Sequence, residues 1–178
     1  MPRLLPFAAA ALALLPAASV SAQGMMQPPP PLPAGTRAPA FTTRTTAGRP
    51  LTLKSLRGKV VLLDYWATWC GPCQMATPML ENLSRKFGPK GLAVVGMSVD
   101  DSRSVGQVKP FMKHFGMTYI VTVSPAANGK AQYAYHVNGI PSQFLIDKKG
   151  IVRWSQSGFS PNEGQELAPM IKRLLAQK

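Results

Sequence analysis

Acidic residues are scarce in this chain of 178 residues. It has 7 aspartates and glutamates against 20 lysines and arginines, so its formal net charge is +13 at neutral pH. Such a charge favours anionic partners or surfaces. The basic residues are nevertheless scattered from Arg37 to Lys178, whereas nucleic-acid binding is typically indicated by basic residues clustered with aromatic ones. We therefore interpret them as a solvated surface and expect no nucleic-acid partner.

Cysteine and histidine are equally rare. The chain holds only Cys70, Cys73, His114 and His136. A structural zinc site needs four such ligands at close spacing, and the histidines lie far from the cysteines without a pairing motif, so we expect no metal centre of that kind. Two thiolates can still hold copper(I), which is a soft ion. A glycine-rich phosphate loop and a serine–histidine arrangement are also missing, and we expect no cofactor.

Long hydrophobic runs are missing after residue 22. Residues 1–22 combine Arg3, an apolar stretch and the small residues 20–22, which is the layout of a cleaved secretory signal peptide. Pro6, Pro16 and the shortness of the run disfavour a membrane span, which needs about 20 apolar residues. The sequence thus predicts export to the periplasm, and an uncleaved segment that tethers the protein to the inner membrane stays open as the alternative.

Proline is concentrated just after this segment. Residues 23–40 contain four consecutive prolines at 28–31 and almost no charge, which predicts a semi-rigid, extended linker. The folded domain is then expected over residues 41–178, a length that suits one hydrophobic core. We expect this domain to be a monomer.

Helical and strand patterns alternate through residues 41–178. This alternation predicts an α/β fold, and an antiparallel pair of strands near the end makes the central sheet a mixed one, flanked by helices. The expected elements, in order, are a hairpin at 41–53, a strand at 59–66, a helix at 71–87, a strand at 92–99, a helix at 104–115, a strand at 119–123, one or two helical turns at 131–135, strands at 142–147 and 151–155, and a helix that opens with a capping box at 160–163 and runs toward residue 175.

Cys70 and Cys73 stand where a hydrophobic strand passes into a helix. A disulfide between them would close a very short loop, so it would remove little entropy from the unfolded chain and would stabilise the fold weakly. At a helix N-terminus the free backbone amides and the helix dipole favour a thiolate. We therefore interpret the pair as redox-active, with Cys70 as the exposed nucleophile and Cys73 as the partly buried resolving thiol.

The residues around this pair resemble thioredoxin. WCGPC follows KVVLLDYWAT, and Gly139-Ile140-Pro141 comes later in the chain. Residues 38–178 as a whole resemble the exported TlpA-like branch, on the expected hairpin, an extra strand and helix at 92–123, and the segment GIPSQFLIDKKG. The resemblance implies a thioredoxin-like fold with an N-terminal β-hairpin and an extra β-α insertion. It also implies dithiol–disulfide exchange. From the CGPC motif, Asp64 and the signal peptide together, we predict that the substrates are exported proteins that contain disulfides and that a membrane-bound thiol relay is the electron donor.

The resemblance also assigns residues that contact the substrate. The family's cis-proline falls on Pro141, and the backbone of Ile140 would pair with the substrate strand. Trp69, Gly71 and Pro72 complete the expected substrate-binding set. The alternative for Ile140 and Pro141 is a simple turn before a strand.

Asp64 interrupts the apolar strand that precedes Cys70. It falls on the buried aspartate of thioredoxins, where loss of solvation raises the carboxyl pKa and suits the group to accept a proton from the inner thiol. The alternative is an aspartate that faces solvent. Ala76 stands where relatives in cytochrome c maturation commonly carry glutamate, which weakens an assignment to apocytochrome reduction.

Three functions therefore remain after the sequence has been considered. The favoured one is an exported reductase of protein disulfides, which could serve cytochrome c or copper-site maturation. A copper(I)-binding or chaperone-like module would use the same two thiols without turnover. A disulfide oxidase or isomerase would use them at a different redox potential.

Overall fold

The computed structural model describes residues 31–177. The predicted signal peptide at 1–22 and the first part of the predicted linker, residues 23–30, lie outside these residues. Within the described range, no helix has the length and apolar character that crossing a membrane requires.

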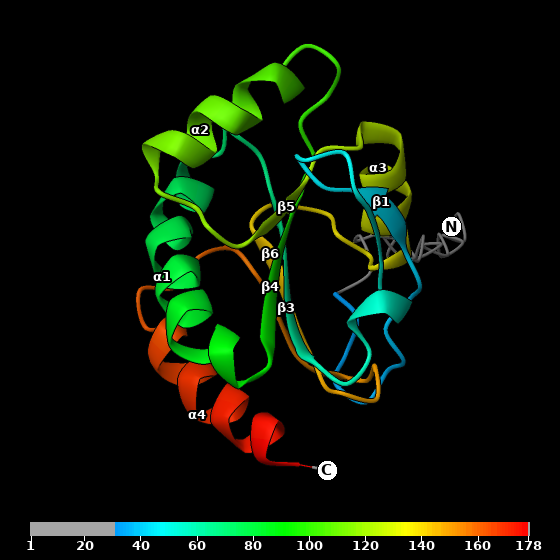
Figure 1. The fold of residues 1–178 in the computed structure, drawn as a ribbon, viewed down its shortest axis with the longest axis vertical. Coiled ribbons are helices and arrows are strands. Elements are labelled where there is room, and N and C mark those ends of the chain that lie inside the picture. The colour runs from blue at the N-terminus through cyan, green and yellow to red at the C-terminus, as the bar shows by residue number, and fades with distance from the viewer. Residues whose placement is uncertain (1–30, 178) are drawn as a thin grey trace, which may run out of the picture.

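A five-stranded mixed sheet forms the centre of the molecule, with the strand order β5-β4-β3-β6-β7 (Figure 1). Strands β3 (Val60–Trp66), β4 (Leu92–Ser98) and β5 (Ile120–Thr122) run parallel, whereas β6 (Ser142–Ile146) and β7 (Val152–Ser157) are antiparallel additions. Every residue of β3 and β4 is buried, which explains why their sequences are almost continuously apolar. The predicted central mixed sheet is confirmed.

The other elements cover the two faces of this sheet. Helices α1, α2 and α4 lie on one face, and α3 lies with the two-stranded hairpin on the other (Figure 1). Their bounds are α1 Gly71–Phe87, α2 Val108–His114, α3 Pro125–Ala134, α4 Glu163–Ala176, β1 Thr42–Arg44 and β2 Pro50–Thr52, with short 3-10 turns at Lys54–Leu56, Gly88–Lys90 and Val105–Gln107. The N-terminal hairpin and the extra segment that ends in β5 are therefore present as predicted.

Side chains of β3 alternate between the two hydrophobic layers that result. Leu62 and Trp66 pack into the layer under α1 and α4, whereas Leu63 and Tyr65 pack into the layer under α3. Because alternate residues of a strand share a face, Asp64 points into the first layer. This is the layer that also contains Cys73.

The packed region begins before Phe41, where the sequence placed the start of the domain. Leu32 and Ala38 are buried, and two backbone amides bond to the end of the sheet, Gly35 to the carbonyl of Val152 at 2.8 Å and Ala38 to that of Gly150 at 2.9 Å. Residues 32–38 thus lie along β7 and partly cover that edge strand, an arrangement that protects a sheet edge. Proline tolerates such a position because it needs no partner for an amide.

Helix α3 is longer than the one or two turns that its sequence suggested. Its Asn128 is completely buried and bonds to residues far away in the chain, accepting from the Thr43 hydroxyl at 2.6 Å and donating to the Ser98 carbonyl at 2.8 Å. These tertiary contacts hold in place a segment with weak helical periodicity.

The start of α4 also differs from the predicted capping box. The helix begins at Glu163, and Asn162 is its N-cap residue without a side-chain capping bond. Only half of the box forms, in which the Ser160 amide donates to Oε2 of Glu163 at 3.4 Å.

Candidate active site

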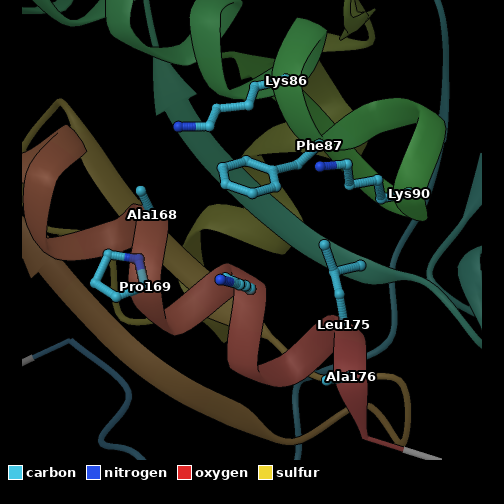
Figure 2. A pocket seen from close by; sticks show the side chains of 8 residues that line it. Lys86, Phe87, Lys90, Ala168, Pro169, Leu175 and Ala176 are labelled. Carbon is cyan, nitrogen blue, oxygen red and sulfur yellow. The ribbon is translucent and has the colours of Figure 1, made fainter.

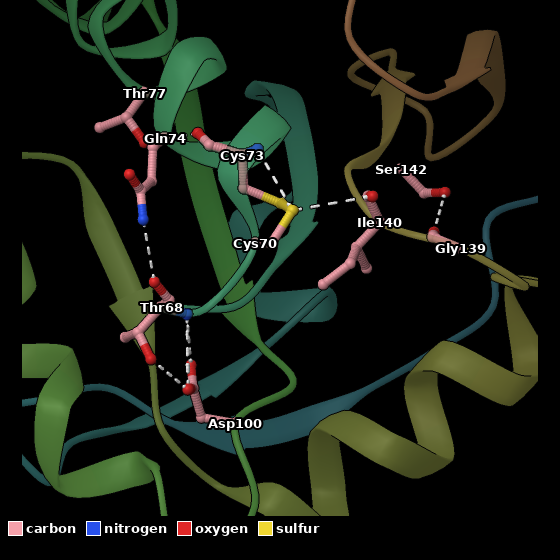
Figure 3. The surroundings of a disulfide bond; sticks show 9 residues. All are labelled: Thr68, Cys70, Cys73, Gln74, Thr77, Asp100, Gly139, Ile140 and Ser142. Carbon is pink, nitrogen blue, oxygen red and sulfur yellow. Dashed lines mark hydrogen bonds between the residues drawn. A yellow bond between two sulfur atoms is a disulfide. The ribbon is translucent and has the colours of Figure 1, made fainter.

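Cys70 and Cys73 form a disulfide at the N-terminus of α1 (Figure 3). Cys70 is the N-cap residue of this helix, and its Sγ accepts a hydrogen bond from the Cys73 amide at 3.2 Å. Pro72 fits the first turn because the amide that it lacks would have no partner inside the helix. The bond from the amide and the helix dipole both favour negative charge on the Cys70 sulfur once the disulfide is reduced.

Both cysteines are buried in this disulfide state. Cys70 is 6% exposed and Cys73 is 2% exposed, so the expectation of an exposed Cys70 is wrong for the oxidised protein, although the order of exposure is as expected. Part of the cover comes from the loop before β6, whose Ile140 carbonyl oxygen lies 3.7 Å from Cys70 Sγ (Figure 3). The bond between Ile140 and Pro141 is cis, which confirms the predicted cis-proline.

The other predicted substrate residues surround the disulfide. Trp69, Gly71 and Pro72 are exposed, Ile140 is half-buried and Pro141 is buried. Trp69 has 65% of its surface exposed and lines an apolar groove of about 520 Å³, which continues to Phe111 and Phe115. The structure thus brings the predicted residues together beside Cys70.

Asp100 holds the loop before Cys70 and was missed by sequence reasoning. Its side chain is fully buried and accepts from the Thr68 amide at 3.1 Å and the Thr68 hydroxyl at 2.6 Å (Figure 3). It also accepts from the Ser98 hydroxyl at 2.8 Å. Asp100 and Thr68 each follow the carboxyl end of one of two neighbouring parallel strands. Sites gather at such ends, and this signal could have pointed to the pair.

We expect Asp100→Ala to lower the rate of disulfide exchange by roughly tenfold or more, because the loop that positions Cys70 loses its anchor. The change leaves buried donors of Thr68 and Ser98 unpaired, so unfolding in denaturant should show a loss of about 3 kcal/mol. Asp101→Asn is the matched control, since Asp101 is the exposed neighbour and bonds only within its own turn. Equal exchange rates in the two variants would show that Asp100 does not position the loop.

Asp64 is buried, as the sequence predicted, with 2% of its surface exposed. It lies opposite Gly96 of β4 and Gln143 of β6, and its Oδ1 atom has no hydrogen-bond partner among the described residues. Burial raises the pKa of Asp64 to about 8, the negative charge of Glu163 adds to this rise, and the neighbouring Gln143 side chain opposes it. Asp64 can therefore take up a proton in the neutral pH range.

Tyr119 is a neighbour of Asp64 and of Thr77, and Thr77 bonds to the inner cysteine. The Thr77 hydroxyl donates to the Cys73 carbonyl at 2.9 Å. The pKa of Tyr119 is raised first by burial and then by the charge of Asp64, while a hydrogen bond with Thr77 lowers it. Asp64 faces the same layer of the molecule as Cys73.

Glu163, the first residue of α4, is another buried carboxyl, and sequence reasoning missed its burial. It is 0% exposed, and burial raises its pKa to about 7, opposed by a hydrogen bond from the Ser160 amide and assisted by the charge of Glu166. A sequence signal does exist, because Glu163 starts a stripe at helical spacing that continues with Leu167, Ile171 and Leu174.

A larger pocket, of about 570 Å³, lies away from the cysteines between the C-terminal ends of α1 and α4 (Figure 2). Phe87 and Leu175 contribute apolar surface to it, and Lys86, Lys90 and Lys172 contribute cations. Lysines near helix C-termini interact favourably with the helix dipole, so their presence here needs no bound ligand to explain it. The pocket contains neither cysteine and is not part of the redox site. Among residues 31–177, no group of three or more histidine, cysteine or acidic side chains could hold a metal ion.

Comparison with known proteins gives consistent results. The model of the Redoxin family matches residues 33–171. The thiol-disulfide oxidoreductase ResA of Bacillus cereus is 34% identical over 66% of this chain and 66% of its own length, just under two thirds, and ResA of Bacillus thuringiensis subsp. konkukian is 32% identical over 79% and 78%. The structure of a candidate thiol:disulfide interchange protein DsbE from Chlorobium tepidum superposes with a TM-score of 0.74 at 32% identity, covering 82% of this chain and 99% of that one.

The fold, the Cys70–Cys73 disulfide and these relatives define a thiol-disulfide oxidoreductase of the thioredoxin superfamily. The TlpA-like resemblance and the thioredoxin-like fold are thereby confirmed. The chain belongs to the Redoxin family.

Proposed function

We propose that this protein is an exported reductase that passes electrons from the Cys70–Cys73 dithiol to disulfides of exported proteins. The observation that carries the proposal is Asp64, a buried carboxyl that faces the layer containing Cys73 and can accept a proton in the neutral range. A resolving thiol must lose its proton before it can attack, and a nearby base speeds this step. Trp69, Gly71, Pro72, Ile140 and Pro141 form the surface that receives the substrate.

The reaction has two exchange steps. The Cys70 thiolate attacks a sulfur of the substrate disulfide, a mixed disulfide forms, and the departing substrate thiolate takes up a proton from solvent. Cys73 then gives its proton to Asp64, and its thiolate attacks Cys70 Sγ. The Cys70–Cys73 disulfide forms, and the second substrate thiolate leaves and is protonated. Two electrons have moved to the substrate, and the dithiol has been oxidised.

The cellular setting is part of the same proposal. Residues 1–22 have the pattern of a signal peptide, which supports export to the periplasm, either free or tethered to the inner membrane by the uncleaved segment. Because each cycle ends with an oxidised pair, a membrane-bound thiol relay must restore the dithiol. Maturation of cytochrome c or of copper sites would provide substrates of this kind. We propose that the protein acts as a monomer.

The direction of the reaction is tested with insulin. The protein, kept reduced by dithiothreitol, should precipitate the insulin B chain catalytically, and its midpoint potential should lie in the range of reductants such as thioredoxin. A strongly oxidising potential with rapid oxidation of reduced proteins would indicate an oxidase or isomerase instead. Tight stoichiometric binding of copper(I) without insulin reduction would indicate a copper-binding or chaperone-like module.

A further inference from the structure

Glu163 occupies a position where an apolar side chain would be expected. It begins the buried stripe of α4, which otherwise consists of Leu167, Ile171 and Leu174. Helix α4 contacts both α1 and β3, and its first turn lies so close to α1 that a Cβ atom on Gly164 would come within 2.8 Å of Met79 Cγ. Glu163 is therefore enclosed between these elements, at 0% exposure.

Asp64 shares this layer with Glu163. It stands between Leu62 and Trp66 on the face of β3 that α1 and α4 cover. Each of the two carboxyls has one buried oxygen without a hydrogen-bond partner among the described residues, Oδ1 of Asp64 and Oε1 of Glu163. Neither carboxyl is in an ion pair in the described part of the chain. Two buried, unneutralised acids in one apolar layer are costly to the fold, which suggests a function.

A purely structural role accounts for only one of the two carboxylate oxygens of Glu163. Its Oε2 atom accepts from the Ser160 amide at 3.4 Å, so the side chain helps to cap α4. Glutamine could make the same bond, since it also serves in capping boxes. The cap therefore does not account for an ionisable group in this position, nor for the unpaired oxygen.

We propose that Glu163 is a positioning residue of the redox reaction, which acts through Asp64 and controls whether Asp64 carries a proton when Cys73 attacks the mixed disulfide. This inference rests on the function proposed above. The negative charge of Glu163 disfavours a second negative charge on Asp64, so Asp64 holds its proton to higher pH and is a stronger base when it loses it. Glu163 itself changes charge near pH 7, which makes the effect depend on pH in the neutral range.

The other groups that face these two carboxyls do not cancel this effect. Tyr119, which precedes β5, and Gln143 of β6 are uncharged neighbours of Asp64. From α1, Cys73 and Thr77 lie on the side of the disulfide. On α4 the charged neighbour is Glu166, whose negative charge, like burial, raises the pKa of Glu163.

The test is the titration of the Asp64 carboxyl carbon by NMR in the oxidised protein, which needs no enzymatic activity. Glu163→Gln keeps the cap and removes the charge, and it should move the Asp64 midpoint to lower pH by roughly one unit. The pH profile for resolution of the mixed disulfide should move in the same direction by a similar amount. Glu166→Gln, which removes an exposed charge from the same helix, should move both much less.

The outcomes separate this inference from the proposed function. An unmoved Asp64 midpoint in Glu163→Gln, or an equal movement in Glu166→Gln, overturns the inference and leaves the reductase proposal intact. A moved midpoint with an unmoved rate profile overturns the inference together with the role of Asp64 as proton acceptor. If Glu163→Gln fails to fold, the titration of Asp64 in the wild-type protein tests the inference instead. Its Asp64 signal should then titrate in two steps, one of which coincides with the titration of Glu163, whereas a single step overturns the inference.

Discussion

Cys70→Ser is expected to reduce the precipitation of insulin by dithiothreitol to the uncatalysed rate. Cys70 is the N-cap residue of α1, and its sulfur accepts a hydrogen bond from the Cys73 amide at 3.2 Å. The helix therefore favours the thiolate form of this sulfur. It is also the sulfur beside the Ile140 carbonyl, at the surface where the substrate is expected to bind. Serine has a similar size but cannot form a mixed disulfide. The measurement is the turbidity of the B chain against time.

Cys73→Ser is the matched variant, with a different expected result. It keeps the first attack by Cys70 but removes the thiol that resolves the mixed disulfide, so a covalent complex with the substrate should accumulate. Non-reducing electrophoresis and mass spectrometry would detect this complex, and the same variant can capture natural partners. Full activity in Cys70→Ser combined with loss in Cys73→Ser would reverse the assigned roles of the two cysteines.

Asp64→Asn is expected to stabilise the oxidised protein at neutral and alkaline pH. The folded-state pKa of Asp64 is raised from 3.8 to about 8, so the folded protein binds the proton more tightly than the unfolded chain. Below pH ~4 the group is protonated in both states and costs nothing through ionisation. As the pH rises from there toward 8, the wild type loses stability relative to Asp64→Asn by about 1.4 kcal/mol per pH unit. Denaturant unfolding of both proteins at a series of pH values measures this difference.

The same substitution at Asp147 should change the stability of the protein in the opposite direction. Burial alone would raise the pKa of Asp147, but bonds from the amides of Ile151 and Lys149 and from the Arg153 side chain lower it overall. Asp147→Asn should therefore be less stable than the wild type at neutral pH, and the difference should shrink as the pH falls below ~4.

Parallel pH–stability curves for the wild type and Asp64→Asn would mean that Asp64 is not a buried titrating group, and its catalytic role would be withdrawn. In activity, Asp64→Asn should slow release of the mixed disulfide at neutral pH and leave the first attack by Cys70 nearly unchanged.

The sequence alone determined the features that depend on neighbours in the chain. The alternation of apolar runs and helical stripes predicted the strands and, apart from α3, the helices within a few residues, because periodicity records which face each element buries. The spacing of Cys70 and Cys73 at a junction of strand and helix predicted a redox pair, and the resemblance to thioredoxin predicted a buried Asp64. A resemblance carried by a few consecutive residues added the cis-proline at Pro141, which no spacing rule could have shown.

Only the tertiary structure decided which distant residues meet. Asp100 reaches Thr68 because two parallel strands end side by side, and Glu163 shares a layer with Asp64 because α4 returns to pack on β3. The burial of Cys70 and the attachment of residues 32–38 to β7 likewise depend on segments far away in the chain, the loop at Ile140 and the end of the sheet. From the sequence alone, an acid at the start of a helix such as Glu163 is interpreted as a helix cap. Its raised pKa and its effect on Asp64 appear only when packing removes both carboxyls from water.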